Sequence, residues 1–176
     1  LCLYDEENGY YARNISSVGK DGDFSTTPSL SPVLADSLAG SIVNSGLRDV
    51  IEIGPGAGDL ASRLLRKLRP PLLSFRKRIR YHLVERSPPL QSLLKKRIGR
   101  VAKFHQDMKS ALKATGGSAF ILSNELVDAF PVRVFKGTKE AILELFLSLK
   151  DDDLTEKWLP ASDLPDSRQF EFSRDS

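Results

Sequence analysis

Short apolar runs alternate with runs of helical periodicity between residues 49 and 123, and this order limits the fold more than any other property of the chain. The runs expected to be strands are 49–53, 79–85, 101–105 and 118–123. Helices are expected at 57–68 and 88–98, with a helical turn at 108–114. Strands that alternate with helices predict a mostly parallel sheet with helices on both faces. The expected fold class is therefore α/β and Rossmann-like.

Composition divides the chain into three parts. Residues 1–36 are rich in Gly, Asn, Pro and Ser and are expected to form a loop-rich lead segment. Residues 37–150 are expected to form the ligand-binding Rossmann-like domain, and 151–176 an acidic irregular tail. A helix is predicted to begin after the Ser31-Pro32 cap and to end at Gly46.

The stretch after the apolar fourth strand is predicted to form a β-hairpin. Residues 132–135 and 141–149 are the expected strands, joined by a turn at Lys136-Gly137. The second run is also compatible with a helix, but the alternation in "ELFLSL" favours a strand.

The remaining composition excludes some kinds of site. The single cysteine, Cys2, excludes an intrachain disulfide and a cysteine-based metal site, and we expect no metal ion. His82 and His105 lie inside strand patterns and are interpreted as structural. No apolar run is long enough to span a membrane. The basic stretch 63–80 is interpreted as a solvated face, because no aromatic ladder accompanies it as in many nucleic-acid sites.

A glycine-rich turn follows the first expected strand in the run "VIEIGPGAGDL". Its glycines, Gly54, Gly56 and Gly58, permit positive φ and a close approach of the backbone to a ligand. Asp59 stands where the dinucleotide fingerprint has its third glycine, and it would repel a pyrophosphate. Glu52 suits a cation. The turn therefore favours S-adenosylmethionine, which has an ammonium, a sulfonium and no phosphate; an ordinary tight turn is the alternative.

Acidic and amide side chains follow the second and third expected strands. Glu85 ends the second strand, where a carboxylate can accept hydrogen bonds from ribose hydroxyls. A first-turn acid favoured by the helix dipole is the alternative for Glu85. Gln106 and Asp107 follow the third strand, where an acid or amide can reach an adenine amino group. All lie at carboxyl ends of strands, the edge at which open α/β sheets bind ligands.

The run "SNELVDAFPV" directly follows the fourth expected strand. Asn124, Glu125 and Asp128 are the expected catalytic residues, which would orient an acceptor nitrogen and form forked hydrogen bonds with a guanidinium. Methyl transfer is an in-line displacement in which an enzyme mainly aligns the reactants, so no metal or covalent residue is required. A helix cap is the alternative for these polar residues.

Five motifs in order resemble one family. They are "YDEENGYYAR" (4–13), "GDFSTTPSLSPVLADSLA" (22–39), "VIEIGPGAGDLA" (50–61), "YHLVERSPPLQ" (81–91) and "SNELVDAFPV" (123–132). Together they resemble the MidA-type class I S-adenosylmethionine-dependent methyltransferases, a family that includes a mitochondrial complex I assembly factor with protein arginine methyltransferase activity. The resemblance covers roughly residues 4–150.

The resemblance implies a fold, a cofactor and a set of binding residues. The fold would be the class I methyltransferase sandwich, incomplete in this chain, with residues 37–150 binding S-adenosylmethionine. The cofactor-binding residues would be Gly22, Asp23, Phe24, Thr26, Glu52, Gly54, Gly56, Gly58, Glu85, Gln106 and Asp107. Glu125 and Asp128 would face the acceptor.

The resemblance also implies a reaction and a place in the cell. The chain would catalyse symmetric dimethylation of arginine on a protein, a complex I subunit for the mitochondrial member, rather than act on nucleic acid. The compartment would be the mitochondrial matrix in a eukaryote and the cytoplasm in a bacterium. A catalytically impaired short form that acts as an assembly protein is the alternative.

Two departures bear on that alternative. Ser29 stands where the family usually has an acid, and Ala35-Asp36 where it usually has glycine and an acid. The family's chains also run well past this one, so we expect a fragment, a truncated isoform or a divergent short copy, with an exposed sheet edge.

Overall fold

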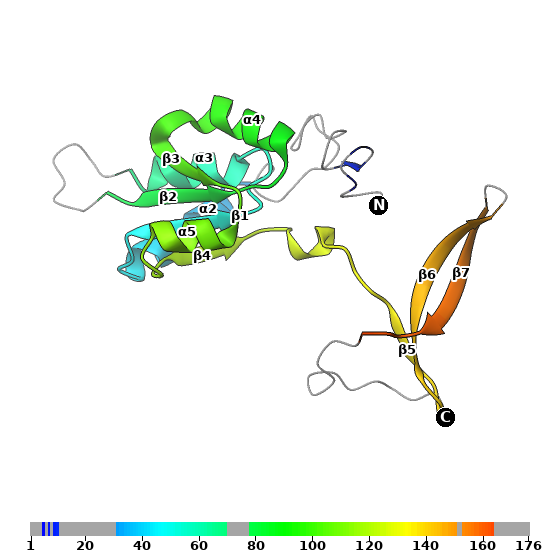
Figure 1. Ribbon diagram of the computed structural model, residues 1–176. Coiled ribbons are helices and arrows are strands. Elements are labelled where there is room, and N and C mark those ends of the chain that lie inside the picture. Colours follow the sequence, from blue (N-terminus) through cyan, green and yellow to red (C-terminus); the bar gives the residue numbers. More distant parts are fainter. Residues whose placement is uncertain are drawn as a thin grey trace. The chain divides into compact units, whose positions relative to one another are not determined.

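The computed structural model describes residues 5, 7, 9, 10, 31–69, 78–150 and 153–163. The chain forms two compact units, Leu1–Phe130 and Pro131–Ser176 (Figure 1). Most of the predicted lead segment lies outside the described residues.

A four-stranded parallel sheet forms the centre of the first unit. Its strands are β1 (Asp49–Ile53), β2 (Arg80–Val84), β3 (Ala102–His105) and β4 (Phe120–Ser123). They lie in the order β3-β2-β1-β4, and each neighbouring pair is parallel. The four predicted strands and their parallel arrangement are confirmed.

Helix α2 (Val33–Asn44) precedes β1, and α3 (Asp59–Lys67), α4 (Pro88–Ile98) and α5 (Met108–Ala114) connect the strands. Two 3-10 turns follow α4 and β4: η2 (Gly99–Val101) and η3 (Val127–Ala129). The predicted Ser87 cap is confirmed, because its hydroxyl accepts a hydrogen bond from the Leu90 N–H at 3.5 Å. The predicted start of the α3 helix was two residues early, because Gly58 has a left-handed φ of 82° and still belongs to the turn.

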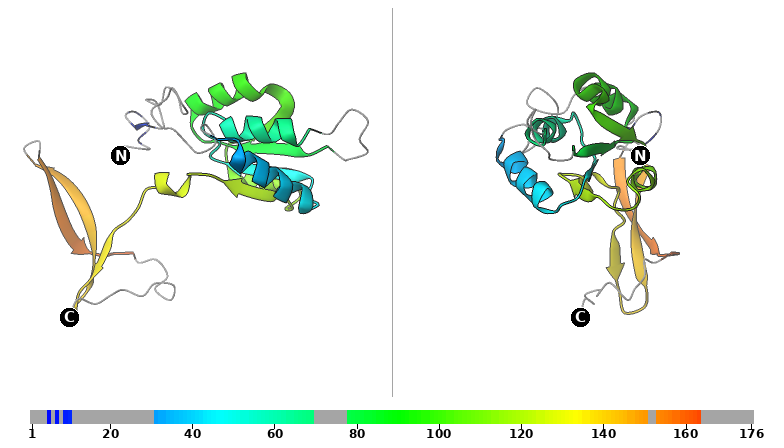
Figure 2. Two further views of the ribbon diagram at one scale, coloured as in Figure 1. Left: turned by 180° about the vertical axis from the view of Figure 1, so that it is seen from behind. Right: turned by 90° about the vertical axis from the view of Figure 1, so that its left-hand side faces the viewer.

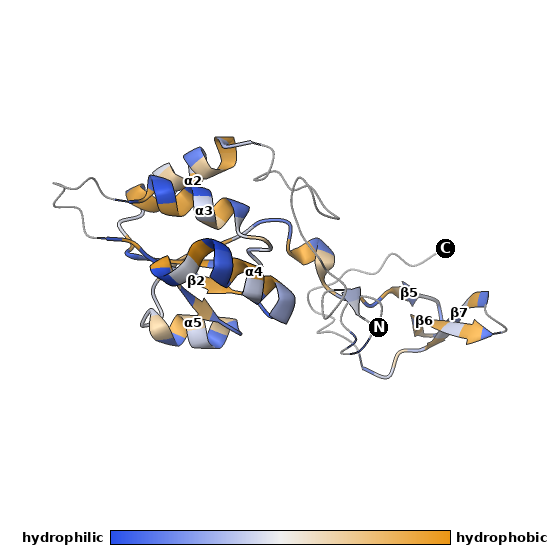
Figure 3. Ribbon diagram, turned by 90° about the horizontal axis from the view of Figure 1, so that it is seen from above, coloured by the Kyte–Doolittle hydropathy of each residue, from blue (hydrophilic) through white to orange (hydrophobic). Residues whose placement is uncertain are grey.

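The helices cover both faces of the sheet, as predicted. One face packs against α2, α3 and α4 through Ile42, Leu64 and Leu94, which meet Val50 and Leu83 of the sheet. The other face packs against α5 (Figure 2). The helices carry both apolar and polar residues (Figure 3), and their buried apolar residues pack against the sheet.

Strand β4 forms one edge of the sheet. Within the described residues it pairs only with β1, and Ile121 is 48% exposed. Leu122 on the opposite face is buried beneath the helices. An apolar strand is therefore covered on one side only.

The second unit is a three-stranded antiparallel sheet in the order β5-β6-β7. Its strands are β5 (Phe135–Gly137), β6 (Ile142–Lys150) and β7 (Asp153–Pro160). The predicted strand at 141–149 is confirmed. The predicted turn at Lys136-Gly137 was too early: Thr138 donates its N–H to the Ala141 carbonyl at 2.9 Å, and its hydroxyl accepts from the Ala141 N–H at 3.0 Å.

The prediction of an irregular tail was wrong for residues 153–160. Strand β7 pairs with β6 so that Leu154 lies opposite Leu149 and Trp158 opposite Leu145. Cross-strand apolar pairs of this kind stabilise a sheet, and they outweigh the acidic composition of the segment.

A forked ion pair supports the second unit. Arg133 donates to both carboxylate oxygens of Glu144, at 2.6 and 2.7 Å, and to the Asp163 carbonyl at 2.8 Å. The guanidinium also lies 4.9 Å from the centre of the Phe135 ring. Across both units, none of the described helices combines the length and apolar character needed to cross a membrane.

Candidate functional site

The parallel register brings the described site residues to the end of the sheet at which all four strands finish. The last residue of β1, Ile53, is aligned with Val84 of β2 and Ser123 of β4, and Val84 with His105 of β3. The segments after all four strands therefore begin side by side, where open α/β sheets bind ligands. Of the predicted residues, Gly22, Asp23, Phe24 and Thr26 lie outside the described part of the chain.

The glycine turn has the backbone that its sequence predicts. Gly54, Gly56 and Gly58 have φ values of 65°, 55° and 82°, a left-handed conformation that favours glycine. Gly54 donates its N–H to the Val84 carbonyl at 3.0 Å, and Gly58 donates to the Pro55 carbonyl at 2.9 Å. These bonds hold the turn against the end of β2.

Two of the glycines are also required by protein packing. A Cβ atom on Gly58 would lie 2.8 Å from Leu94 Cδ2 in α4, and one on Gly54 would lie 2.5 Å from Leu126 Cδ1. Both distances are shorter than real Cβ contacts, so only glycine fits without a shift. The sequence signals a close approach here, but it does not say that α4 and the segment after β4 make it.

Glu52 is buried beneath the turn. Its side chain lies on the face of β1 that α2, α3 and α4 cover, and it accepts a hydrogen bond from the Tyr81 hydroxyl at 2.7 Å. Burial raises the pKa of Glu52 to about 7, although the Tyr81 hydrogen bond favours the charged form. A buried carboxylate that titrates near neutrality is typical of a functional site. Sequence reasoning missed Tyr81, whose only signal was its place on the same face of the neighbouring strand.

Glu85 lies against the glycine turn. The Ser87 N–H donates to Glu85 Oε1 at 2.8 Å. Burial raises the pKa of Glu85, and the backbone N–H groups of Ser87, Arg86 and Gly56 oppose that rise. The structure therefore brings Gly56 and Glu85 together, and Gln91 holds the Glu85 carbonyl with a 2.6 Å hydrogen bond from its side-chain amide.

Asp59, at the start of α3, is paired with an arginine from α4. Arg97 donates to Asp59 Oδ1 at 2.6 Å and to the Ala57 carbonyl at 3.0 Å. The guanidinium of Arg97 compensates the charge of Asp59, so Asp59 would repel a pyrophosphate less than the sequence alone predicts. Sequence reasoning missed Arg97, which lies about forty positions away along the chain.

Asp107 serves as the N-cap of α5. Its Oδ1 accepts from the Ser110 N–H at 2.6 Å, and its carbonyl accepts from the Ser110 hydroxyl at 2.9 Å. The Ser110 hydrogen bonds lower the pKa of Asp107. Gln106 is exposed beside it. The cap holds both residues at the end of β3.

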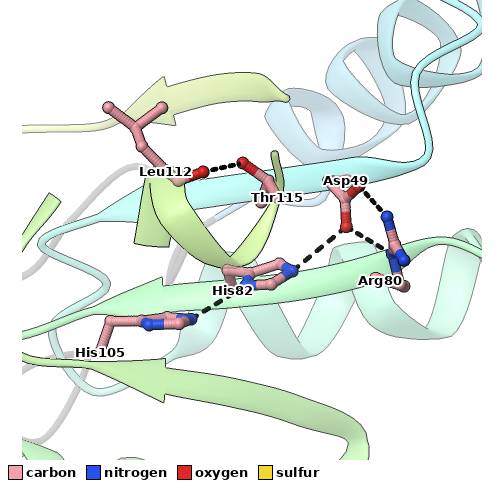
Figure 4. A network of polar contacts seen from close by, with 6 residues as sticks. All are labelled: Asp49, Arg80, His82, His105, Leu112 and Thr115. Carbon is pink, nitrogen blue, oxygen red and sulfur yellow. Dashed lines mark hydrogen bonds and ion pairs between the residues drawn. The ribbon is translucent and has the colours of Figure 1, made fainter. Parts of the chain in front are cut away.

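A polar network crosses the face that α5 covers (Figure 4). Asp49 is paired with the Arg80 guanidinium, and its Oδ1 lies 3.2 Å from His82 Nε2. His82 Nδ1 lies 2.9 Å from His105 Nε2. Burial lowers the pKa of both histidines. Burial would raise the pKa of Asp49, but the hydrogen bonds and charges of Arg80 and His82 bring it below its usual value.

This network ties the amino end of β1 to the carboxyl end of β3. In the part of the chain that the structure describes, no group of three His, Cys, Asp or Glu side chains could hold a metal ion.

The segment after β4 forms a tight turn with a strained residue. Glu125 has a φ of 48°, the only positive value among the described residues other than glycine. Asn124 is half-buried, whereas Glu125 and Asp128 are exposed. Asp128 lies in η3, which shows no side-chain cap. Left-handed backbone at a residue with a side chain costs about 1–2 kcal/mol and is frequent at functional sites.

These features define a class of protein: an α/β domain with a parallel sheet and a glycine-rich turn where its first strand ends. Residues 40–174 match the family described as "Putative S-adenosyl-L-methionine-dependent methyltransferase". The chain belongs to this family of methyltransferases, as its motifs predicted.

Similar curated proteins are arginine methyltransferases. The chain is 26% identical to "Protein arginine methyltransferase NDUFAF7, mitochondrial" of Xenopus tropicalis over 84% of its own length, and 26% identical to the Danio rerio protein of that name over 82%. It covers 40% of each relative. The chain thus spans about two fifths of the length of the curated relatives it matches.

Solved structures share the fold. A Burkholderia thailandensis protein crystallised with S-adenosyl-homocysteine superposes with a TM-score of 0.73, 24% identity, and coverage of 96% of this chain and 46% of that one. An uncharacterised protein from the same organism gives a TM-score of 0.60, 25% identity, and coverage of 87% and 43%. The Rossmann-like fold is therefore confirmed.

Proposed function

We propose that this chain binds S-adenosylmethionine at the carboxyl edge of its parallel sheet and takes part in methylation of protein arginine. The observation that carries this proposal is the contact between the glycine turn and Glu85, where the Gly56 N–H helps to stabilise the carboxylate. A turn with three left-handed glycines beside a half-buried acid suits a nucleoside. The printed description of the family supports the same ligand.

The residues present fit the parts of this donor. Glu85 would accept hydrogen bonds from the ribose hydroxyls, and Gln106 and Asp107 would lie near adenine. Glu52 would supply the negative charge below the ammonium, and the absence of side chains on the glycines would let the donor approach the backbone. The lead residues Gly22, Asp23, Phe24 and Thr26 are proposed to complete the site.

The acceptor side would be formed by the segment after β4. When bound, S-adenosylmethionine supplies a methyl group on a cationic sulfonium. Glu125 and Asp128 would hold an arginine guanidinium through charge-assisted hydrogen bonds, and Asn124 would orient one of its nitrogens. Both carboxylates are exposed, which makes them accessible to a protein substrate.

The names of the relatives support finer proposals. Protein arginine as the acceptor follows from the printed names of the curated relatives, and so does a mitochondrial location if the source is a eukaryote. Symmetric dimethylation of a complex I subunit is proposed from the motif resemblance. A catalytically impaired form with an assembly role is the second candidate, because Ser29 and Ala35-Asp36 depart from the family's usual residues.

Calorimetry tests donor binding. We expect S-adenosyl-homocysteine to bind the chain and NAD not to bind, since the family description supports a donor without a pyrophosphate. Glu85→Ala should lower the affinity by about tenfold or more, the loss of a charge-assisted hydrogen bond, whereas the exposed Glu140→Ala in the second unit should leave it unchanged. Absence of S-adenosyl-homocysteine binding would contradict the proposal.

Transfer of a labelled methyl group to an arginine-containing protein separates the two candidates. Transfer that is lost in Glu125→Gln supports catalysis. Donor binding without transfer to any arginine substrate favours the assembly role.

A further inference from the structure

The donor-side and acceptor-side motifs touch at one side chain. The whole side chain of Leu126 lies on Gly54: the position of a Cβ on Gly54 is 2.5 Å from Leu126 Cδ1, 3.5 Å from Cγ and 3.7 Å from Cβ. Leu126 stands between the acceptor residues Glu125 and Asp128. The contact therefore joins the glycine turn to the segment that carries both exposed carboxylates.

The two sides of this contact differ in rigidity. Gly54 is held by its 3.0 Å hydrogen bond to the Val84 carbonyl at the end of β2. Leu126 is only half-buried and follows the strained Glu125. A change in the turn must therefore be taken up by Leu126 rather than by the sheet.

The backbone of Leu126 extends the connection to Asp128. The Leu126 carbonyl accepts a hydrogen bond from the Ala129 N–H at 3.2 Å and so opens the η3 turn in which Asp128 lies. A displacement of Leu126 would move Glu125 on one side and Asp128 on the other.

We propose that Leu126 is a positioning residue that couples the arrangement of Glu125 and Asp128 to donor binding at the glycine turn. The proposal rests on donor binding at the glycine turn, as proposed above. When the donor occupies the turn, Leu126 is held against Gly54, and the two carboxylates are held in the arrangement that receives the guanidinium. Leu126 acts through its contact with Gly54.

A fluorescent reporter on the acceptor segment tests this coupling. Val127 is 71% exposed, so Val127→Trp places a probe beside Leu126 without disturbing the core. Trp158→Phe removes the single natural tryptophan, which lies in the second unit. In this background we expect S-adenosyl-homocysteine to shift the emission of the probe. Leu126→Ala should abolish the shift while the dissociation constant measured by calorimetry changes by less than about threefold, because it leaves the proposed donor-binding residues Glu85 and Asp107 in place.

A conservative variant and an activity measurement complete the test. Leu126→Met keeps an apolar side chain of similar volume and should restore the emission shift. In methyl transfer, Leu126→Ala should lower kcat by about tenfold with little change in the KM of the donor, a split that a purely structural role would not produce.

The outcomes are distinct. An equal emission shift with Leu126 and with alanine would overturn this proposal alone, and so would a loss of donor affinity that parallels the loss of the shift. If the unsubstituted chain does not bind S-adenosyl-homocysteine, the proposed function falls and this inference falls with it.

Discussion

Replacement of Glu52 by glutamine should remove a pH-dependent loss of stability. Burial raises the pKa of Glu52 from 4.5 to about 7, while the unfolded chain keeps the ordinary value. Between these values the folded protein retains a proton that the unfolded chain has already released. The free energy of unfolding therefore falls as pH rises through this window, and above pH 7 the loss is complete.

The magnitude follows from the size of the pKa difference. At 1.36 kcal/mol for each pKa unit, a rise from 4.5 to about 7 corresponds to about 3 kcal/mol, most of which falls between pH 5 and pH 8. Glutamine cannot ionise, and its carbonyl can still accept the hydrogen bond from Tyr81. The stability difference between Glu52→Gln and the natural chain should shift by roughly 2–3 kcal/mol in favour of the variant over that range.

Urea unfolding followed by circular dichroism at pH 5, 6, 7 and 8 measures this difference. The pH dependence is the quantity to compare, because the amide of glutamine adds a constant cost where it lacks a partner. Glu140→Gln, at an exposed glutamate, is the matched control and should run parallel to the natural chain. Parallel curves for Glu52→Gln and the natural chain would show that Glu52 is not held protonated in the fold, and the reasoning from its burial would fail.

The same carboxyl links donor binding to pH under the proposed function. A cationic donor favours the ionised form, so binding at pH 6 should release up to one proton. Calorimetry in two buffers of different ionisation enthalpy measures this proton, and Glu52→Gln should release none. Equal proton release by both proteins would assign the proton to another group.

Three further predictions concern the surroundings of the site. Gly58→Ala should destabilise the fold by about 2 kcal/mol or more in the same urea experiment, because it combines a left-handed backbone with a clash against Leu94. Gly46 also has a positive φ of 71° but open space around it, so Gly46→Ala should cost only about 1 kcal/mol. Arg97→Ala should weaken S-adenosyl-homocysteine binding by about tenfold, because it removes the hydrogen bonds to Ala57 and Asp59. The control Arg100→Ala replaces an exposed arginine nearby and should bind as the natural chain does. Equal weakening by both variants would show that only the lost positive charge matters. Because burial lowers the pKa of His105, the unfolded chain takes up its proton first, so the stability that His105 contributes should be lost as pH falls below 6.5. The stability of His105→Gln relative to the natural chain should therefore rise as pH falls from 7 to 5.

Local sequence patterns predicted the first unit well. Apolar runs flanked by caps and glycines located its strands and helices, because the signals for helix ends and buried strands lie within a few residues of each other. The family motifs identified the methyltransferase family without any contact information. The tail was mispredicted because the pairing of Leu154 with Leu149 and of Trp158 with Leu145 comes from β6 and is invisible in an acidic stretch read alone.

The sequence by itself determined the order of strands and helices, the glycine turn, and the family to which the chain belongs. Only the tertiary structure decided which side chains meet: Tyr81 with Glu52, Arg97 with Asp59, and Leu126 with Gly54. The physical reason is that local preferences act over a few bonds, whereas each of these contacts joins different elements of the sheet and its covering helices. Burial, and therefore the pKa of Glu52, exists only after those elements have packed together.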